Sequence, residues 1–197
     1  MTDDLRSVAT ETRAEYAYKP ALLGPVWHFR LTPDAIEWTA GPRSGRTAYA
    51  DIRRLRLSFR PLSMQARRFY AEIWPARGDK LQVASTSWRG MADHERHDAA
   101  YRAFMLELHR RLADAQAPIS FESGSPAWRY WPGLVVFAAV VLALAALAVQ
   151  AVATHAWSGA GFVAVVLALF LWQAGGYFKR NRPGRYRPQT PPRDLLP

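Results

Sequence analysis

Residues 131–178 read WPGLVVFAAVVLALAALAVQAVATHAWSGAGFVAVVLALFLWQAGGYF, a stretch without a single Asp, Glu, Lys or Arg. The polar pair Thr154-His155 divides it into two apolar segments. Each has about 20 residues, enough for a helix that crosses a hydrocarbon core of roughly 30 Å. Because a backbone in lipid must satisfy its own hydrogen bonds, we expect transmembrane helices over residues 131–153 and 161–178, joined by an external turn over 154–160.

Charged and aromatic residues at the ends of these segments predict the orientation of the hairpin. Basic residues flank both ends, whereas the turn carries no Lys or Arg. By the positive-inside rule, both chain termini should lie in the cytoplasm. The acidic start Met1-Thr2-Asp3-Asp4, with no apolar run after it, argues against a cleaved signal peptide. The predicted anchors at the membrane interface are Trp128, Arg129, Trp131, Trp157, Tyr177, Lys179 and Arg180.

Small residues recur at helical spacing in both spans, a pattern that lets helices approach closely. They are Ala139, Ala143 and Ala146 in the first span and Gly161, Ala164, Ala168 and Gly175 in the second. An Ala-rich composition explains them equally well, so a homodimer through the hairpin remains an open expectation. Gln150 and Gln173 lie at different depths and cannot pair within one chain. Since neither span carries a charge, no ion path is expected.

Composition limits the chemistry of the chain. The formal net charge of +10 favours an anionic neighbour, either lipid headgroups or nucleic acid. The absence of Cys excludes disulfides and thiolate catalysis. Arg exceeds Lys and Ala is abundant, as GC-rich bacterial coding would produce, so the choice of Arg carries little information. Together with the spans, these features favour a multi-pass protein of a bacterial inner membrane.

Before the hairpin, the sequence predicts one compact α+β domain over residues 21–116, preceded by a flexible segment over 1–20. Alternating apolar and polar residues with turn signals between them predict about six short strands. They cover residues 27–31, 36–39, 46–49, 52–60, 67–74 and 80–85. Residues 117–130 are expected to be a linker, and 179–197 a basic, Pro-rich tail that is extended and disordered in the cytoplasm.

One amphipathic helix should close this domain. Asp93 is a plausible N-cap for it. Apolar residues recur at helical spacing and form a single stripe: Tyr101, Phe104, Met105, Leu108 and Leu112. The helix should end at Ala117-Pro118.

Six strands followed by one amphipathic helix resemble a pleckstrin-homology-like (PH-like) barrel. The segment FRLTPDAIEW at residues 29–38, followed by Tyr49-Ala50-Asp51-Ile52, is similar to small bacterial PH-like membrane proteins. In that family a strand pair leads through such a turn into a long strand, with transmembrane helices beside the domain. The resemblance covers roughly residues 20–116. It implies a small antiparallel barrel capped by a helix and no catalytic residues, while an open sheet with one covering helix fits the periodicity nearly as well.

The best candidate for a binding surface is basic. On the strand over residues 52–60, arginines alternate with apolar residues and therefore share one face, which we expect Arg68 to extend on the next strand. The predicted lipid- or partner-binding residues are Arg54, Arg56, Arg60 and Arg68. Near an anionic membrane each basic group contributes roughly 1 kcal/mol. An ordinary solvated face is the alternative.

Catalytic and cofactor motifs are missing from the sequence. His94, His97 and Asp98 can share a helix face, but they lack the His-Glu-x-x-His spacing, and Arg96 would repel a cation. We expect no metal, no cofactor and no enzymatic activity. The predicted function is binding or scaffolding at the membrane. The alternatives are a membrane-tethered nucleic-acid-binding domain, which is less favoured, and an accessory subunit of a membrane enzyme complex.

Overall fold

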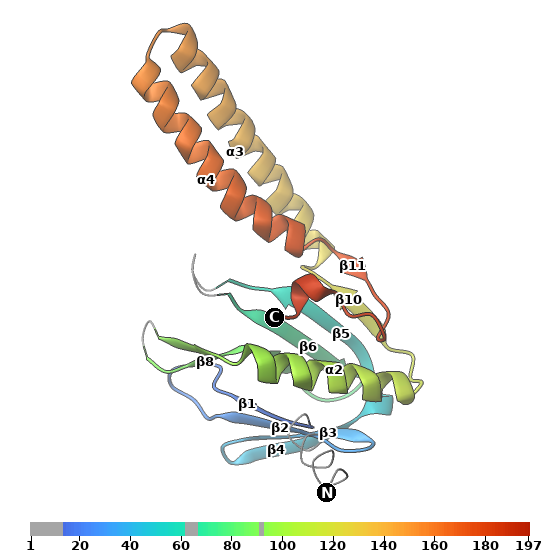
Figure 1. The fold of residues 1–197 in the computed structure, drawn as a ribbon. Helices are drawn as coiled ribbons and strands as arrows, with labels where there is room; N and C mark the ends of the chain where they lie inside the picture. The colour runs from blue at the N-terminus through green and yellow to red at the C-terminus, as the bar shows by residue number, and fades with distance from the viewer. Residues whose placement is uncertain (1–13, 62–66, 91–92) are drawn as a thin grey trace, which may run out of the picture. The chain divides into compact units, whose positions relative to one another are not determined.

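The computed structural model describes residues 14–61, 67–90 and 93–197 (Figure 1). The chain divides into two compact units. One comprises Met1–Ser123 together with Gly184–Pro197, and the other comprises Gly124–Pro183. The first unit is an α+β domain and the second is a pair of long apolar helices.

Four antiparallel strands form the first sheet, in the order β1-β2-β3-β4. They are β1 (Glu15–Tyr18), β2 (Trp27–Leu31), β3 (Ala35–Ala40) and β4 (Arg43–Ala48). Alternation along β2 buries Phe29 and Leu31 and exposes His28 and Arg30. Gly45 of β4 lies opposite Trp38, and a Cβ there would lie 2.6 Å from the indole ring. The Trp38 ring therefore packs directly on the backbone of Gly45, where any larger residue would clash with it.

Five strands form the second sheet, in the order β11-β10-β5-β6-β7. They are β5 (Ile52–Phe59), β6 (Phe69–Pro75), β7 (Leu81–Ala84), β10 (Ser120–Ser123) and β11 (Gly184–Arg185). The short 3-10 turn η1 (Tyr49–Asp51) leads into β5. The sheet is mixed, because β10 runs parallel to β5 while the other neighbours are antiparallel. Its inner face is apolar, with Leu55, Leu57 and Ile73 fully buried.

Helix α2 (Asp98–Asp114) packs against the core of the domain (Figure 1). The predicted apolar stripe from Tyr101 to Leu112 is buried, which confirms the helix and its face. The ring of Phe104 lies 5.6 Å from that of Tyr16 and 6.3 Å from that of Phe29. The helix begins later than expected, because β9 (His94–Arg96) pairs with β8 (Thr86–Trp88) and keeps those residues extended.

The α+β class predicted from the sequence is confirmed. Over residues 14–61, 67–90 and 93–197, the strands form separate sheets of four, five and two strands and no closed barrel. Five of the strands lie outside the six predicted ranges: β1, β8, β9, β10 and β11. Each of these has between two and four residues, too few for alternation to reveal.

Both chain ends of the domain are more ordered than the sequence predicts. Within the segment expected to be flexible, the Tyr16 and Tyr18 hydroxyls of β1 donate hydrogen bonds to the carbonyls of Ala84 and Gln82, at 2.6 and 2.7 Å. Residues 1–13 lie outside the described residues. The expected linker contains β10, and the expected disordered tail contains β11 and the 3-10 turn η2 (Arg193–Leu195). Apolar and aromatic side chains in these short segments complete the core.

Helices α3 (Ala127–Ala153) and α4 (Trp157–Arg180) form the second unit and are each long and apolar enough to cross a membrane. They pack through aromatic rings, with Phe137 lying 5.2 Å from Phe170 and 5.1 Å from Phe178. The turn is shorter than predicted, since α4 already begins at Trp157. Ala139, Ala143, Ala146, Ala164 and Ala168 are exposed, so these small residues do not mediate the contact between α3 and α4.

The two ends of the hairpin meet at Gly124. The Ser125 amide donates a hydrogen bond of 2.9 Å to the Asn181 carbonyl. Gly124 has φ +76°, and a Cβ there would lie 2.4 Å from the carbonyl oxygens of Asn181 and Arg182. Glycine thus allows the entering and leaving segments to lie directly side by side.

Candidate functional site

Outward side chains of the second sheet form a surface that we call the arginine face. It consists of Arg54, Arg56, Ser58, Arg60, Arg68, Tyr70, Glu72, Trp74, Lys80 and Glu122. Strand pairing sets Arg54 opposite Trp74 and Arg56 opposite Glu72. The structure therefore brings the four predicted arginines together on one side of the sheet.

Aromatic rings hold these cations in place. The Arg54 guanidinium lies 4.2 Å from the ring centre of Trp74, and Arg60 lies 4.6 Å from that of Tyr70. Arg56 and Arg68 lie over the same two rings, at 5.3 and 5.4 Å. Such cation–π contacts leave the N–H edge of a guanidinium free to bind an oxygen acceptor. Tyr70 and Trp74 were not among the predicted site residues, although alternation along the strand places both on one face with Arg68.

Two of the four arginines are neutralised within the domain. Arg56 pairs with Glu122, its Nε lying 3.0 Å from Oε2, and both side chains are largely buried. Arg60 lies 3.0 Å and Lys80 2.9 Å from Glu72, whose side chain is 6 % exposed. Burial acts to raise the pKa of Glu72, but the hydrogen bond from Lys80 and the charge of Arg60 hold this pKa below its usual value. Neither carboxylate was predicted as part of the site.

Arg54 and Arg68 differ from this pair. No ion pair joins either of them to a carboxylate of the described residues. Burial lowers the pKa of Arg68, Tyr70 opposes this and the charge of Arg60 adds to it. The Arg68 Nε and the neighbouring Ser58 Oγ are both buried, and neither has a hydrogen-bond partner among the described residues. One end of the arginine face therefore presents a partly desolvated cation whose Nε has no acceptor in the described part of the chain, an arrangement that an oxyanion would satisfy.

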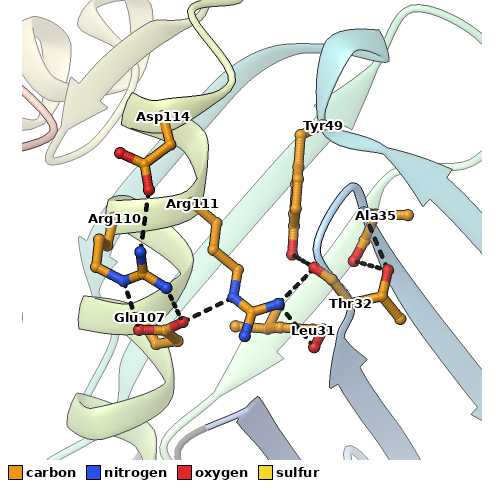
Figure 2. A network of polar contacts seen from close by, with 8 residues as sticks. All are labelled: Leu31, Thr32, Ala35, Tyr49, Glu107, Arg110, Arg111 and Asp114. Atoms are coloured by element: carbon orange, nitrogen blue, oxygen red, sulfur yellow. Dashed lines mark hydrogen bonds and ion pairs between the residues drawn. The ribbon is translucent and has the colours of Figure 1, made fainter. Parts of the chain in front are cut away.

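A second polar cluster joins α2 to the turn between β2 and β3 (Figure 2). Arg111 donates hydrogen bonds to the carbonyls of Leu31, at 3.0 Å, and Thr32, and it lies 2.7 Å from Glu107. The Tyr49 hydroxyl donates to the same Thr32 carbonyl at 2.8 Å. A hollow of about 520 Å³ lies beside this cluster. Because its guanidinium already binds three acceptors, we assign Arg111 to the fold rather than to a ligand.

The histidines near α2 do not share a helix face, because His94 lies in β9. His97 Nε2 lies 2.9 Å from Ser87 Oγ, and Asp98 pairs with Arg96. Over the described ranges, no three His, Asp or Glu side chains gather in a way that would hold a metal ion.

The predicted interface anchors lie near the ends of α3 and α4. Trp128, Trp131 and Trp157 are 74, 58 and 65 % exposed. The Arg129 guanidinium lies 5.2 Å from the ring centre of Trp128. In the last turns of α4, the Tyr177 hydroxyl lies 3.5 Å from Ser125 Oγ, while Lys179 and Arg180 end the helix. Exposed aromatic and basic side chains at helix ends fit a membrane–water boundary.

Comparison of the chain with models of protein families, with curated proteins and with solved structures found no match.

Proposed function

We propose that this chain is a membrane-anchored binding protein of the bacterial inner membrane. Helices α3 and α4 would cross the bilayer, with both termini and the α+β domain in the cytoplasm. Support comes from two long apolar helices, from the basic residues that follow α4 and from the turn without Lys or Arg. The four-stranded sheet, the β5–β7 strands and α2 are compatible with a PH-like scaffold, which we propose as an open variant of that architecture.

The arginine face is the proposed binding surface, and its ligand is the anionic headgroup of a phospholipid. One observation carries the proposal: Arg68 is half-buried and, among the residues that the structure describes, it has no carboxylate partner and its Nε has no acceptor. Headgroup phosphates would supply acceptor oxygens to Arg68 and, separately, to Arg54, since these two arginines lie at opposite ends of the face. Five basic side chains share the face with two carboxylates, so the face keeps an excess of positive charge.

The length of the connecting segments supports a lipid ligand. Three residues separate the end of β10 from the start of α3, and three separate the end of α4 from β11. Even fully extended, each connection spans only about 14 Å. A domain on such short tethers stays at the membrane surface, where anionic headgroups are abundant.

The test uses the full chain in nanodiscs. A single cysteine replacing the exposed Asp79 beside Lys80 carries an environment-sensitive fluorophore, and the chain has no other Cys. We expect anionic phosphatidylserine discs to shift the emission relative to phosphatidylcholine discs. In R54Q/R68Q the docked state should weaken by about 2 kcal/mol, a factor of roughly 30, because each basic group near an anionic surface contributes about 1 kcal/mol.

Arg30 provides the matched control. It lies exposed on the outer side of the first sheet, so R30Q removes one charge without touching the arginine face. We expect R30Q to behave as the wild type, and added salt to weaken docking in both. Equal emission in the two kinds of disc, or equal effects of R30Q and R54Q/R68Q, would show that the arginine face does not bind lipid.

A further inference from the structure

The connection between β1 and β2 presents apolar side chains to solvent. Residues 21–26, which we call the apolar loop, read Ala-Leu-Leu-Gly-Pro-Val. Leu23 is 92 % exposed and Val26 is 41 % exposed. Among the described residues of the α+β domain, Leu106 on α2 is the one other large apolar side chain exposed to this degree. Burial of a leucine side chain contributes about 1.5–3 kcal/mol of free energy. A partner that covered Leu23 would therefore gain this stabilisation.

The apolar loop is fixed at its base. The Lys19 amide donates a hydrogen bond of 3.0 Å to Ser87 Oγ, and the Trp88 amide donates one of 3.0 Å to the Lys19 carbonyl. At the other end, the rings of Trp27 and Trp38 stack at 5.3 Å. Pro25 packs against Gly41, where a Cβ would lie 3.2 Å from the proline ring. The exposed leucine is therefore held in position by ordered backbone on both sides.

Cations, but no carboxylates, accompany the apolar tip in sequence. Lys19 precedes the loop, and Arg43 follows the adjoining Gly41-Pro42 turn; neither Lys19–Trp27 nor Gly41–Gly45 contains an Asp or Glu. An apolar tip beside basic residues matches the interfacial region of an anionic bilayer, where acyl chains lie below phosphates. A protein partner that covered the apolar loop would need an apolar pocket surrounded by acidic residues.

The apolar loop lies at the same end of the domain as Arg68. Lys19, at the base of the loop, bonds to Ser87, and two residues earlier Ser85 Oγ accepts a hydrogen bond of 3.0 Å from the amide of Phe69, the residue next to Arg68. The Tyr18 hydroxyl at the end of β1 donates to the Gln82 carbonyl, the Gln82 side chain accepts from Tyr70, and Arg68 lies over the Tyr70 ring at 5.4 Å. In addition, β10 runs parallel to β5 and so carries the chain towards this end before it leaves for α3.

We propose that the apolar loop inserts Leu23 and Val26 into the lipid interface of the bilayer that α3 and α4 cross. The inference rests on the proposed function only in placing the domain at a bilayer. Lys19 and Arg43 then lie at headgroup level, and the end of the arginine face with Arg68 faces the same surface. Insertion fixes which end of the domain points to lipid, whereas the arginine face selects anionic headgroups.

The experiment reads the loop directly in the full chain. A fluorophore on L23C is compared with one on T39C, an exposed site on the first sheet, in nanodiscs of phosphatidylcholine that hold one copy each. We expect blue-shifted emission and quenching by lipid-attached nitroxides for L23C, and quenching by aqueous iodide for T39C. V26D in the L23C background should reduce the shift, whereas L106D on α2 should leave it unchanged.

Two results would overturn the inference. Iodide quenching of L23C equal to that of T39C would show a loop in water. A blue shift that appears only when discs hold several copies would assign the loop to contact with a second copy. Phosphatidylcholine offers no anionic headgroup for the arginine face, so a failure of the loop is distinguishable from a failure of R54Q/R68Q in phosphatidylserine.

Discussion

At the residue scale, the arginines of this chain divide by what their side chains contact. Alternation along β5 predicts correctly that Arg54, Arg56 and Arg60 share a face. It cannot predict that Glu122 reaches Arg56, because that contact depends on a parallel pairing between residues 66 positions apart. Sequence spacing thus predicts which arginines share a surface. Only the fold shows which of these arginines pair with a carboxylate.

Arg110 and Arg111 provide a matched pair for measuring this difference. Arg111 is 13 % exposed and binds two backbone carbonyls and Glu107, whereas Arg110 is 59 % exposed and pairs with carboxylates on its own helix. R111A should lower the free energy of unfolding by about 2–4 kcal/mol, because it leaves buried acceptors unpaired. R110A should cost less than about 1 kcal/mol. Thermal unfolding by circular dichroism measures both, and equal losses would contradict the role assigned to Arg111.

At the element scale, long strands and the amphipathic helix could be predicted, and short edge strands could not. The range predicted for β5 ended one residue beyond Phe59, and the α2 stripe was correct. The strand β11 has two residues and gains its stability from pairing with β10 and from Tyr186. Pro- and Arg-rich composition suggested a disordered tail, yet Leu195 and Leu196 are 2 and 6 % exposed. A few buried contacts outweigh average composition.

The tail attaches to α2 through His109. Its Nδ1–H donates to the Met105 carbonyl at 2.6 Å, and its Nε2 accepts from the Tyr186 hydroxyl at 2.9 Å. Burial lowers the pKa of His109 from 6.5 to about 4, although the bond to Met105 opposes this. Between those values the unfolded chain takes up a proton that the folded chain does not. The contribution of His109 to the free energy of unfolding is therefore fully present above pH 6.5 and declines as the pH falls towards 4.

We expect this decline to reach about 1.4 kcal/mol per pH unit. Denaturant unfolding of the full chain in detergent, followed by circular dichroism between neutral and acidic pH, measures it. H109Q cannot titrate, so its acid limb should be shallower than that of the wild type. Y186F should be less stable at neutral pH yet keep the wild-type slope. Identical slopes for H109Q and the wild type would show that His109 does not govern acid stability.

At the scale of the whole molecule, the strand pair β10–β11 connects the helix pair α3–α4 to the α+β domain. The chain leaves the domain from β10, forms α3 and α4, and returns as β11, which pairs with β10. The two uncharged apolar runs predicted the hairpin, whereas composition assigned both of its flanks to unstructured segments. In the structure, the segments expected to be a linker and a disordered tail instead contain strands: β11 pairs with β10, and β10 pairs with β5.

This connectivity makes the proposed topology directly testable, because both flanks must lie on the same side of the membrane. The chain has no Cys, so single cysteines report without background. S158C near the turn should react with a membrane-impermeant maleimide in intact spheroplasts. T39C in the domain and T190C in the tail should react only after the membrane is permeabilised, since the positive-inside rule keeps the arginine-rich flank in the cytoplasm. Labelling of T39C before permeabilisation would reverse the topology and remove the cytoplasmic leaflet as the source of the anionic ligand.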